Sequence, residues 1–200
     1  MTWVKICGIT SLDALEAAVE ERADAVGFVF EPNTPRYVGK RQDEVQSWLR
    51  RVPEEIERVA VVGDARNLPP DLEGFSAVQW VVGEPRAEGL RRFKAFALSP
   101  DQPPPTEREA DLVLLDALEK GAWGGTGRTV DWQAAASFVR SSPLPVVLAG
   151  GLTPKNVGEA VRVVQPFGVD VSSGVEVSPG VKDPALVRAF IRAVPRGESI

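Results

Sequence analysis

The chain has 200 residues, of which 44% are hydrophobic and 26% are charged, and this balance is typical of one globular domain over residues 1–200. A net charge of -5 without a basic block argues against nucleic acid or an anionic membrane as a partner. The sequence has no histidine, which excludes every catalytic or metal site that depends on imidazole.

Eight short runs rich in β-branched residues predict strands along the chain. They are residues 3–6, 25–30, 58–62, 77–82, 94–98, 111–115, 145–149 and 168–171. Six other segments have apolar residues at helical spacing and predict helices. These are residues 11–22, 41–52, 87–93, 131–140, 153–164 and 182–194. Alternation of strands and helices predicts a parallel sheet in an α/β fold.

Residues with capping side chains mark four of the predicted helix starts. Ser11, Asp131, Thr153 and Asp183 each precede a helical pattern, and proline follows both Thr153 and Asp183 at the first helical position. Most of these helices are therefore expected to begin directly after strands.

Eight strand–helix units in 200 residues leave about 25 residues for each unit, which predicts a compact, single-domain (β/α)8 TIM barrel. We expect short or irregular helices in unit 3 and in unit 5, where prolines 103–105 argue against a regular helix. A doubly wound open sheet is the competing architecture. That fold usually has five or six strands and a glycine-rich first turn, and the sequence shows neither.

The first strand ends in Lys5-Ile-Cys7, and reactive groups in such barrels lie at the carboxyl ends of strands. Side-chain alternation places Trp3, Lys5 and Cys7 on one face, with Lys5 and Cys7 pointing into the barrel. Cys7 is either a small buried hydrophobe or a reactive thiol. Gly8 and a capped helix follow it, and their backbone N–H groups and dipole would favour a thiolate. A single free thiol also favours a reducing, cytoplasmic location.

Glycine and serine follow the seventh and eighth predicted strands. The residues are Gly150 and Gly151 after one strand, and Ser172, Ser173 and Gly174 after the other. In this fold the same two loops commonly hold phosphate on their main-chain N–H groups. Because the two motifs occur together, we expect a phosphate site here rather than plain tight turns.

Two further residues are ambiguous when each is taken alone. Asp131 follows a glycine-rich loop, residues 121–127, and is a helix cap, an acid, or both. Arg36 lies in a proline-stiffened loop after the second strand and is either a solvated surface residue or a clamp for a carboxylate.

Five ordered motifs resemble those of the phosphoribosylanthranilate isomerase family of tryptophan biosynthesis. They are KICGIT at 5–10, PRY at 35–37, GGTG with a following DW at 124–132, LAGGL at 148–152, and VDVSSGVE at 169–176. The resemblance spans all eight units. It implies a cofactor-free Amadori rearrangement of N-(5-phosphoribosyl)anthranilate to 1-(2-carboxyphenylamino)-1-deoxyribulose 5-phosphate, with this small phosphosugar as the substrate.

The resemblance also implies roles for individual residues. Cys7 would be the general base that removes the C2' proton, and Asp131 the general acid that protonates the furanose oxygen. Arg36 would hold the anthranilate carboxylate, and Asp170 would lie near the ribose hydroxyls. Lys5, on the same inward face as Cys7, is a further candidate substrate contact, and no metal ligand is expected.

One segment departs from the family pattern. The family commonly has Val-Gln-Leu-His-Gly after the fourth strand, whereas this chain has VQWVVG at 78–83. A contact between substrate and Gln79 or Trp80 therefore stays open.

Two other functions fit part of the sequence. Another phosphosugar isomerase or epimerase barrel would share the phosphate site, but the epimerases of this kind use histidine and metal ligands that the sequence lacks. A non-catalytic phosphosugar-binding barrel would have no need of two proton-transfer groups. The sequence is compatible with a monomer and with a homodimer.

Overall fold

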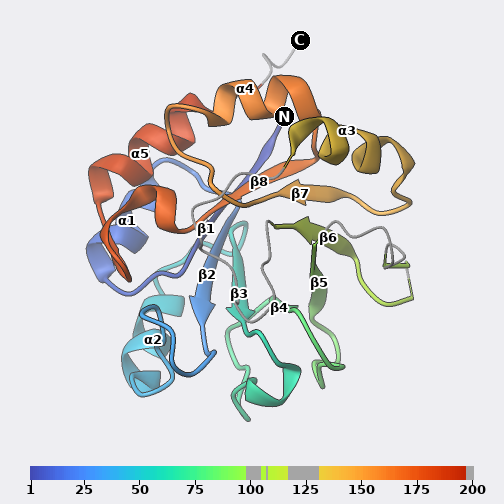
Figure 1. The fold of residues 1–200 in the computed structure, drawn as a ribbon. Coiled ribbons are helices and arrows are strands. Elements are labelled where there is room, and N and C mark those ends of the chain that lie inside the picture. The colour runs from blue at the N-terminus through green and yellow to red at the C-terminus, as the bar shows by residue number, and fades with distance from the viewer. Residues whose placement is uncertain (98–104, 107, 117–130, 197–200) are drawn as a thin grey trace.

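A computed structural model describes residues 1–97, 105–106, 108–116 and 131–196. Eight parallel strands pair in chain order, and β8 pairs with β1 to close the barrel (Figure 1). The strands are β1 Trp3–Cys7, β2 Ala25–Val29, β3 Glu57–Val61, β4 Ala77–Trp80, β5 Arg91–Phe96, β6 Leu112–Leu115, β7 Val146–Leu148 and β8 Gly168–Val171. The predicted (β/α)8 architecture is confirmed, and the open doubly wound sheet is excluded.

Five α-helices lie in the described part of the chain. They are α1 Leu12–Glu20, α2 Gln42–Leu49, α3 Trp132–Ser141, α4 Val157–Val164 and α5 Pro184–Ala193. The predicted caps at Ser11 and Asp183 are confirmed, because their side chains accept hydrogen bonds from the backbone N–H groups of Ala14 and Ala185. No helix among the described residues is long and apolar enough to cross a bilayer.

The predicted start of α4 at Thr153 is wrong. Residues 153–156 form a turn, in which Asn156 Oδ1 accepts a hydrogen bond from Thr153 N at 2.7 Å and Asn156 Nδ2 donates to Gly151 O at 3.0 Å. Thr153 O accepts from Val157 N at 3.1 Å, so this turn leads directly into the helix. The regular helix begins at Val157.

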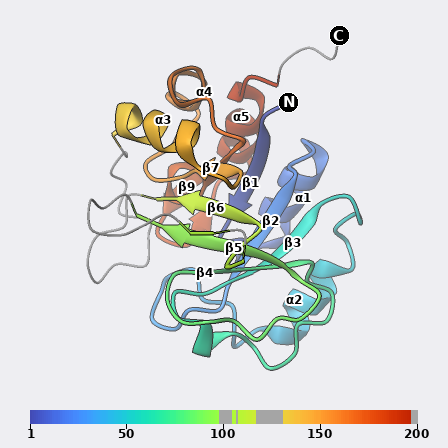
Figure 2. The same ribbon diagram turned by 90° about the vertical axis from the view of Figure 1, so that its right-hand side faces the viewer.

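The middle units of the barrel have little helix. Unit 3 has only the 3-10 turn η1, Ala65–Asn67, as expected from its sequence. The helix predicted at 87–93 is absent, because Arg91 begins β5 and pairs with Ala77 of β4, and Gly89 has a left-handed φ of 77°. Most of the unit 5 connection lies outside the described residues. Figures 1 and 2 show the α-helices grouped around units 1, 2, 6, 7 and 8, whereas the connection after β4 has none.

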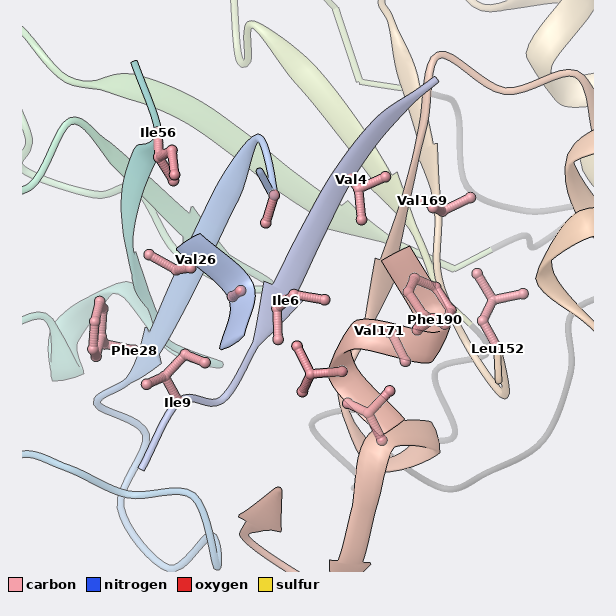
Figure 3. Packing of buried hydrophobic residues seen from close by; sticks show 14 of the residues in the cluster. Val4, Ile6, Ile9, Val26, Phe28, Ile56, Leu152, Val169, Val171 and Phe190 are labelled. Carbon is pink, nitrogen blue, oxygen red and sulfur yellow. The ribbon is translucent and has the colours of Figure 1, made fainter. Parts of the chain in front are cut away.

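Side-chain alternation divides the apolar core into two layers. Val4 and Ile6 of β1 face outward, and Figure 3 shows them with Val169 of β8 and Phe190 of α5 in the layer between strands and helices. Cys7 belongs instead to the smaller cluster inside the barrel. The predicted orientation of β1 is therefore confirmed, and its polar residues point toward the barrel axis.

A short hairpin follows β8 before the last helix begins. The chain passes through the 3-10 turn η2, Ser173–Val175, and then through the antiparallel strands β9, Glu176–Ser178, and β10, Val181–Lys182. This hairpin brings Glu176 and Lys182 to the same end of the barrel as Cys7.

Candidate active site

A cavity of about 290 Å³ lies at the carboxyl ends of the strands. Strands β2 to β5 and the residues directly after them contribute an apolar wall of Val29, Val61, Val62, Val81 and Ala95. Polar groups line the rest of the cavity, mainly Cys7, Asp116, Asp170 and Ser172, together with Arg36 from the loop after β2. The cavity can therefore hold a molecule with one apolar end and one polar end.

Cys7 is a free, buried thiol on the polar side of this cavity. Gly27 of β2 makes room for it, since a Cβ at position 27 would lie 3.1 Å from Cys7 Sγ. Burial raises the pKa of the Cys7 thiol above its ordinary value, although the charges of Lys5 and Lys182 act in the opposite direction. At neutral pH the resting thiol is therefore mainly protonated.

Lys5 and Asp170 form a buried ion pair beside Cys7. Lys5 Nζ lies 2.8 Å from Asp170 Oδ1, and the Lys5 side chain is fully buried. Burial acts to lower the pKa of Lys5, but the charges of Asp170 and Cys7 outweigh it and raise the pKa. Asp170 lines the cavity, whereas Lys5 lies behind it and is not among the lining residues. A direct contact of Lys5 with substrate stays a prediction.

The residues predicted to hold phosphate lie together around a second hollow. This hollow is lined by Gly150, Gly151, Ser172, Ser173 and Gly174, and it shares Asp116 and Asp170 with the main cavity.

Backbone geometry explains why glycine occupies these positions. Gly150 and Gly151 have left-handed φ values of 81° and 63°. A Cβ at Gly174 would lie 1.8 Å from Leu152 O, so any side chain there would push the two loops apart. Glycine therefore lets the loops after β7 and β8 meet.

Arg36 reaches the cavity from the loop after β2 and is held by an acidic side chain. Its Nε and Nη2 atoms donate to Glu176 Oε1 and Oε2, each at 2.8 Å. Its stem lies over Gly8, where a Cβ would be 2.6 Å from Arg36 Cδ. Lys182 Nζ donates to the same carboxylate, at 3.1 Å from Glu176 Oε1. The sequence analysis found Arg36 but missed both of these partners.

Asp131 is confirmed as a helix cap. Its Oδ1 atom accepts hydrogen bonds from Gln133 N at 2.9 Å and Ala134 N at 3.2 Å, at the start of α3. The side chain is exposed and is not among the residues that line the two hollows. Residues 117–130, which include the glycine-rich loop before it, lie outside the described residues. The acid role of Asp131 stays a prediction.

Three other polar residues on the cavity wall were missed or left open by the sequence analysis. Asp116, directly after β6, lines both hollows. Gln79, at the end of β4, lines the main cavity, and its buried Oε1 has no hydrogen-bond partner among the described residues. Glu31 follows β2. Their shared signal is a polar residue at or near the end of an apolar strand, which a systematic reading of strand ends would have found.

Trp80 lies on the opposite face of β4 from Gln79. It is almost fully buried in the outer layer, and the charged groups of Arg92 and Lys94 lie 5.4 and 5.0 Å from its ring centroid. Of the two residues left open after the fourth strand, only Gln79 therefore lines the cavity.

Comparison with known proteins relates the chain to one enzyme family. Residues 87–193 match the family described as N-(5'phosphoribosyl)anthranilate (PRA) isomerase. The N-(5'-phosphoribosyl)anthranilate isomerase of Desulforudis audaxviator is 41% identical over 206 residues, which cover 96% of this chain and 97% of the relative.

Solved structures of the family have the same fold. A phosphoribosyl anthranilate isomerase in complex with reduced 1-(o-carboxyphenylamino)-1-deoxyribulose 5-phosphate superimposes with a TM-score of 0.74 at 33% identity, covering 96% of this chain and 98% of the other. Monomeric forms of the dimeric enzyme from Thermotoga maritima give a TM-score of 0.74 at 34% identity with the same coverage. The chain therefore belongs to the N-(5'-phosphoribosyl)anthranilate isomerase family.

Proposed function

We propose that Cys7 and Asp131 move the protons of an Amadori rearrangement in this chain. As a member of its family the chain is an aldose–ketose isomerase of tryptophan biosynthesis. It converts N-(5'-phosphoribosyl)anthranilate to 1-(2-carboxyphenylamino)-1-deoxyribulose 5-phosphate. The observation that carries the mechanism is the cavity at the strand ends, which combines a buried thiol, an arginine and a glycine-rich hollow.

The first step opens the sugar ring. Asp131 gives a proton to the furanose oxygen while the bond from that oxygen to C1' breaks, and the nitrogen lone pair forms a protonated Schiff base with C1'. Its position at the head of α3 supports this role because α3 follows β6 in the same unit, and Asp116 at the end of β6 lines the cavity. The open-chain Schiff base makes the C2' proton acidic.

The second step removes that proton. The Cys7 thiolate takes the proton from C2', and the electron pair moves to neutralise the Schiff-base nitrogen, which leaves an enolamine. The enolamine then gains a proton at C1' as its C2' hydroxyl loses one, and the ketone forms. Lys5 and Lys182 support this step because their positive charges favour the thiolate that burial disfavours.

The cavity suggests how the substrate is oriented. The phosphate would lie in the hollow formed by Gly150, Gly151 and residues 172–174, with Asp170 near the ribose hydroxyls. The anthranilate ring would lie along the apolar wall of the main cavity, and Arg36 would hold its carboxylate. This orientation places the sugar carbons between the two ends, next to Cys7.

The same reasoning extends to assembly and location. We propose residues 1–200 as one domain that pairs as a homodimer, since the Thermotoga maritima relative is described as dimeric. Sedimentation at micromolar concentration would test this, and a monomer would contradict it. A catalytic thiol that must stay reduced supports a cytoplasmic location.

A turnover assay tests the function itself. The purified chain should consume N-(5'-phosphoribosyl)anthranilate, with a loss of anthranilate-type fluorescence and the appearance of the aminoketose product. A folded protein that binds the substrate but leaves it unchanged would overturn the proposal and favour a non-catalytic binding barrel.

A further inference from the structure

The pairing of Arg36 with Glu176 uses only one side of the guanidinium group. A guanidinium can hold a carboxylate along its side edge, through Nε and Nη2, or along its end edge, through Nη1 and Nη2. Glu176 occupies the side edge, with both bonds at 2.8 Å. Arg36 Nη1 has no hydrogen-bond partner among the described residues, and Nη2 has a second N–H besides the one that Glu176 accepts, so the end edge can bind a second carboxylate.

Glu176 is itself fixed from two sides. Its Oε1 accepts from Lys182 Nζ at 3.1 Å, and its Oε2 accepts from Gly180 N at 3.2 Å. Burial acts to raise the pKa of Glu176, but the hydrogen bonds from Arg36 and the charge of Lys182 outweigh it and hold the pKa below its ordinary value. The carboxylate therefore stays ionised at neutral pH and fixes the orientation of Arg36.

The charges of this group matter as well as its geometry. Arg36 and Glu176 alone would form a neutral pair with little net attraction for an anion. Lys182, whose side chain is fully buried, adds a second positive charge; burial lowers the pKa of Lys182, and the charge of Glu176 acts in the opposite direction. The three residues together keep one positive charge at the cavity wall, which favours an incoming carboxylate.

Glu176 and the two groups that fix it, Lys182 Nζ and Gly180 N, all come from the β9–β10 hairpin or its turn. The turn fits tightly into the site, because Gly180 O accepts from Thr10 Oγ1 at 2.6 Å. A Cβ at Gly180 would lie 2.2 Å from Pro35 O, in the loop that carries Arg36. The hairpin therefore links the loop after β1, the loop after β2 and the end of β8.

We propose that Glu176, fixed by Lys182 and Gly180, is a positioning residue that presents the end edge of Arg36 to the ring carboxylate of the substrate. The β9–β10 hairpin is then the element that selects an ortho-carboxylated aniline over an unsubstituted one. This inference rests on the proposed function, in which Arg36 binds that carboxylate.

The test compares two ligands that differ only in the carboxylate. One is reduced 1-(o-carboxyphenylamino)-1-deoxyribulose 5-phosphate, and the other is its phenylamino analogue without the carboxylate. Dissociation constants are measured by calorimetry, which needs no turnover. We expect the wild type to prefer the carboxylated ligand by about tenfold or more, and Glu176→Gln to lose most of that preference while binding the other ligand as before.

A matched control and a second position make the result specific. Glu44→Gln breaks a similar arginine–glutamate pair with Arg41, but on the exposed surface of α2, and should keep the full preference. Lys182→Gln should reduce the preference through charge, and Lys182→Arg should restore part of it. In steady-state assays Glu176→Gln should raise KM about tenfold with kcat within about threefold.

The outcomes separate this inference from the proposed function. Equal weakening of both ligands in Glu176→Gln would overturn the inference and show a merely structural role. Unfolding of every variant at Glu176 and Lys182 would overturn it in the same way. A wild type that binds the two ligands equally would overturn the role of Arg36 itself, and a wild type that binds neither would overturn the proposed function.

Discussion

The barrel has two unlike halves, and each half meets a different need. Units 1, 2, 6, 7 and 8 have α-helices, and four of them place charged or reactive groups at the cavity, which are Cys7, Arg36, Asp116 and Asp170. Units 3 and 4 have loops and the 3-10 turn η1, and they supply mainly the apolar wall. Polar groups that must be held in place thus come largely from units whose strand is followed by an α-helix. The apolar wall needs only the strands and the residues directly after them.

The largest effect on the polar half is expected from Cys7→Ala. The substitution removes the base but little volume, so kcat should fall about 10² to 10⁴-fold while the melting temperature hardly moves. Steady-state kinetics and thermal melts measure both. A variant with nearly full kcat would show that Cys7 only fills the core, and would remove the chemical difference between the halves.

Asp131→Asn should lower kcat about 10²-fold, because asparagine cannot donate an acidic proton. Asparagine caps a helix about as well as aspartate, so stability should stay within about 1 kcal/mol of the wild type. Kinetics and chemical denaturation together separate the two roles. If the variant is stable and active, Asp131 is only the cap of α3, and Asp170 becomes the acid to test.

The pH profile should report the environment of the thiol. Since burial raises the pKa of Cys7 and the base acts as thiolate, the limb of the kcat/KM profile that reports the thiol should have its midpoint at a pH above that of an ordinary thiol. Assays in buffers of constant ionic strength measure this limb.

The same shift predicts a change in stability. A folded-state thiol pKa above the unfolded value contributes stability that is fully present below the unfolded pKa and is lost as the pH rises through the folded pKa. Cys7→Ser should lack this loss at alkaline pH. If the wild type and Cys7→Ser lost the same amount of stability at alkaline pH, groups other than Cys7 would be the cause.

The smallest effect on activity is expected from Glu31→Gln, because this carboxylate, which follows β2, bonds to the loop of unit 3. The Glu31 carboxylate is buried and accepts from Gly63 N at 2.7 Å, Asp64 N at 3.0 Å and Asn67 Nδ2 at 3.0 Å. The glutamine side chain has one acceptor oxygen where glutamate has two, so some of these N–H groups should lose their partner. The free energy of unfolding should therefore fall by about 1–3 kcal/mol. Urea denaturation measures this.

A control for Glu31→Gln lies on the surface. Glu109 accepts from Thr106, and its side chain is exposed, so Glu109→Gln should change stability by less than Glu31→Gln. If the two variants were equally stable, the Glu31 carboxylate would not be the group that stabilises the loop of unit 3, which has no α-helix.

The strands and much of the site could be predicted because their signals are local. Alternation alone placed Cys7 inside the barrel, and strand-end glycines located the second hollow. The helix predicted at 87–93 was wrong because pairing of Arg91 with β4 overrode its apolar spacing. The clamp of Arg36 could not be predicted from local patterns, since Glu176 lies 140 positions further along the chain.

The environment of Trp80 shows how a strand can do without a helix over it. Two cations of the next strand lie across its indole ring, and its Nε1 donates to Gly83 O at 3.0 Å. The side chains of Arg92 and Lys94 lie over the apolar surface of the Trp80 ring, which a helix would otherwise shield from water. A designer who wants a smaller barrel could therefore delete a helix and place an arginine and a lysine on the neighbouring strand, with a tryptophan beneath them.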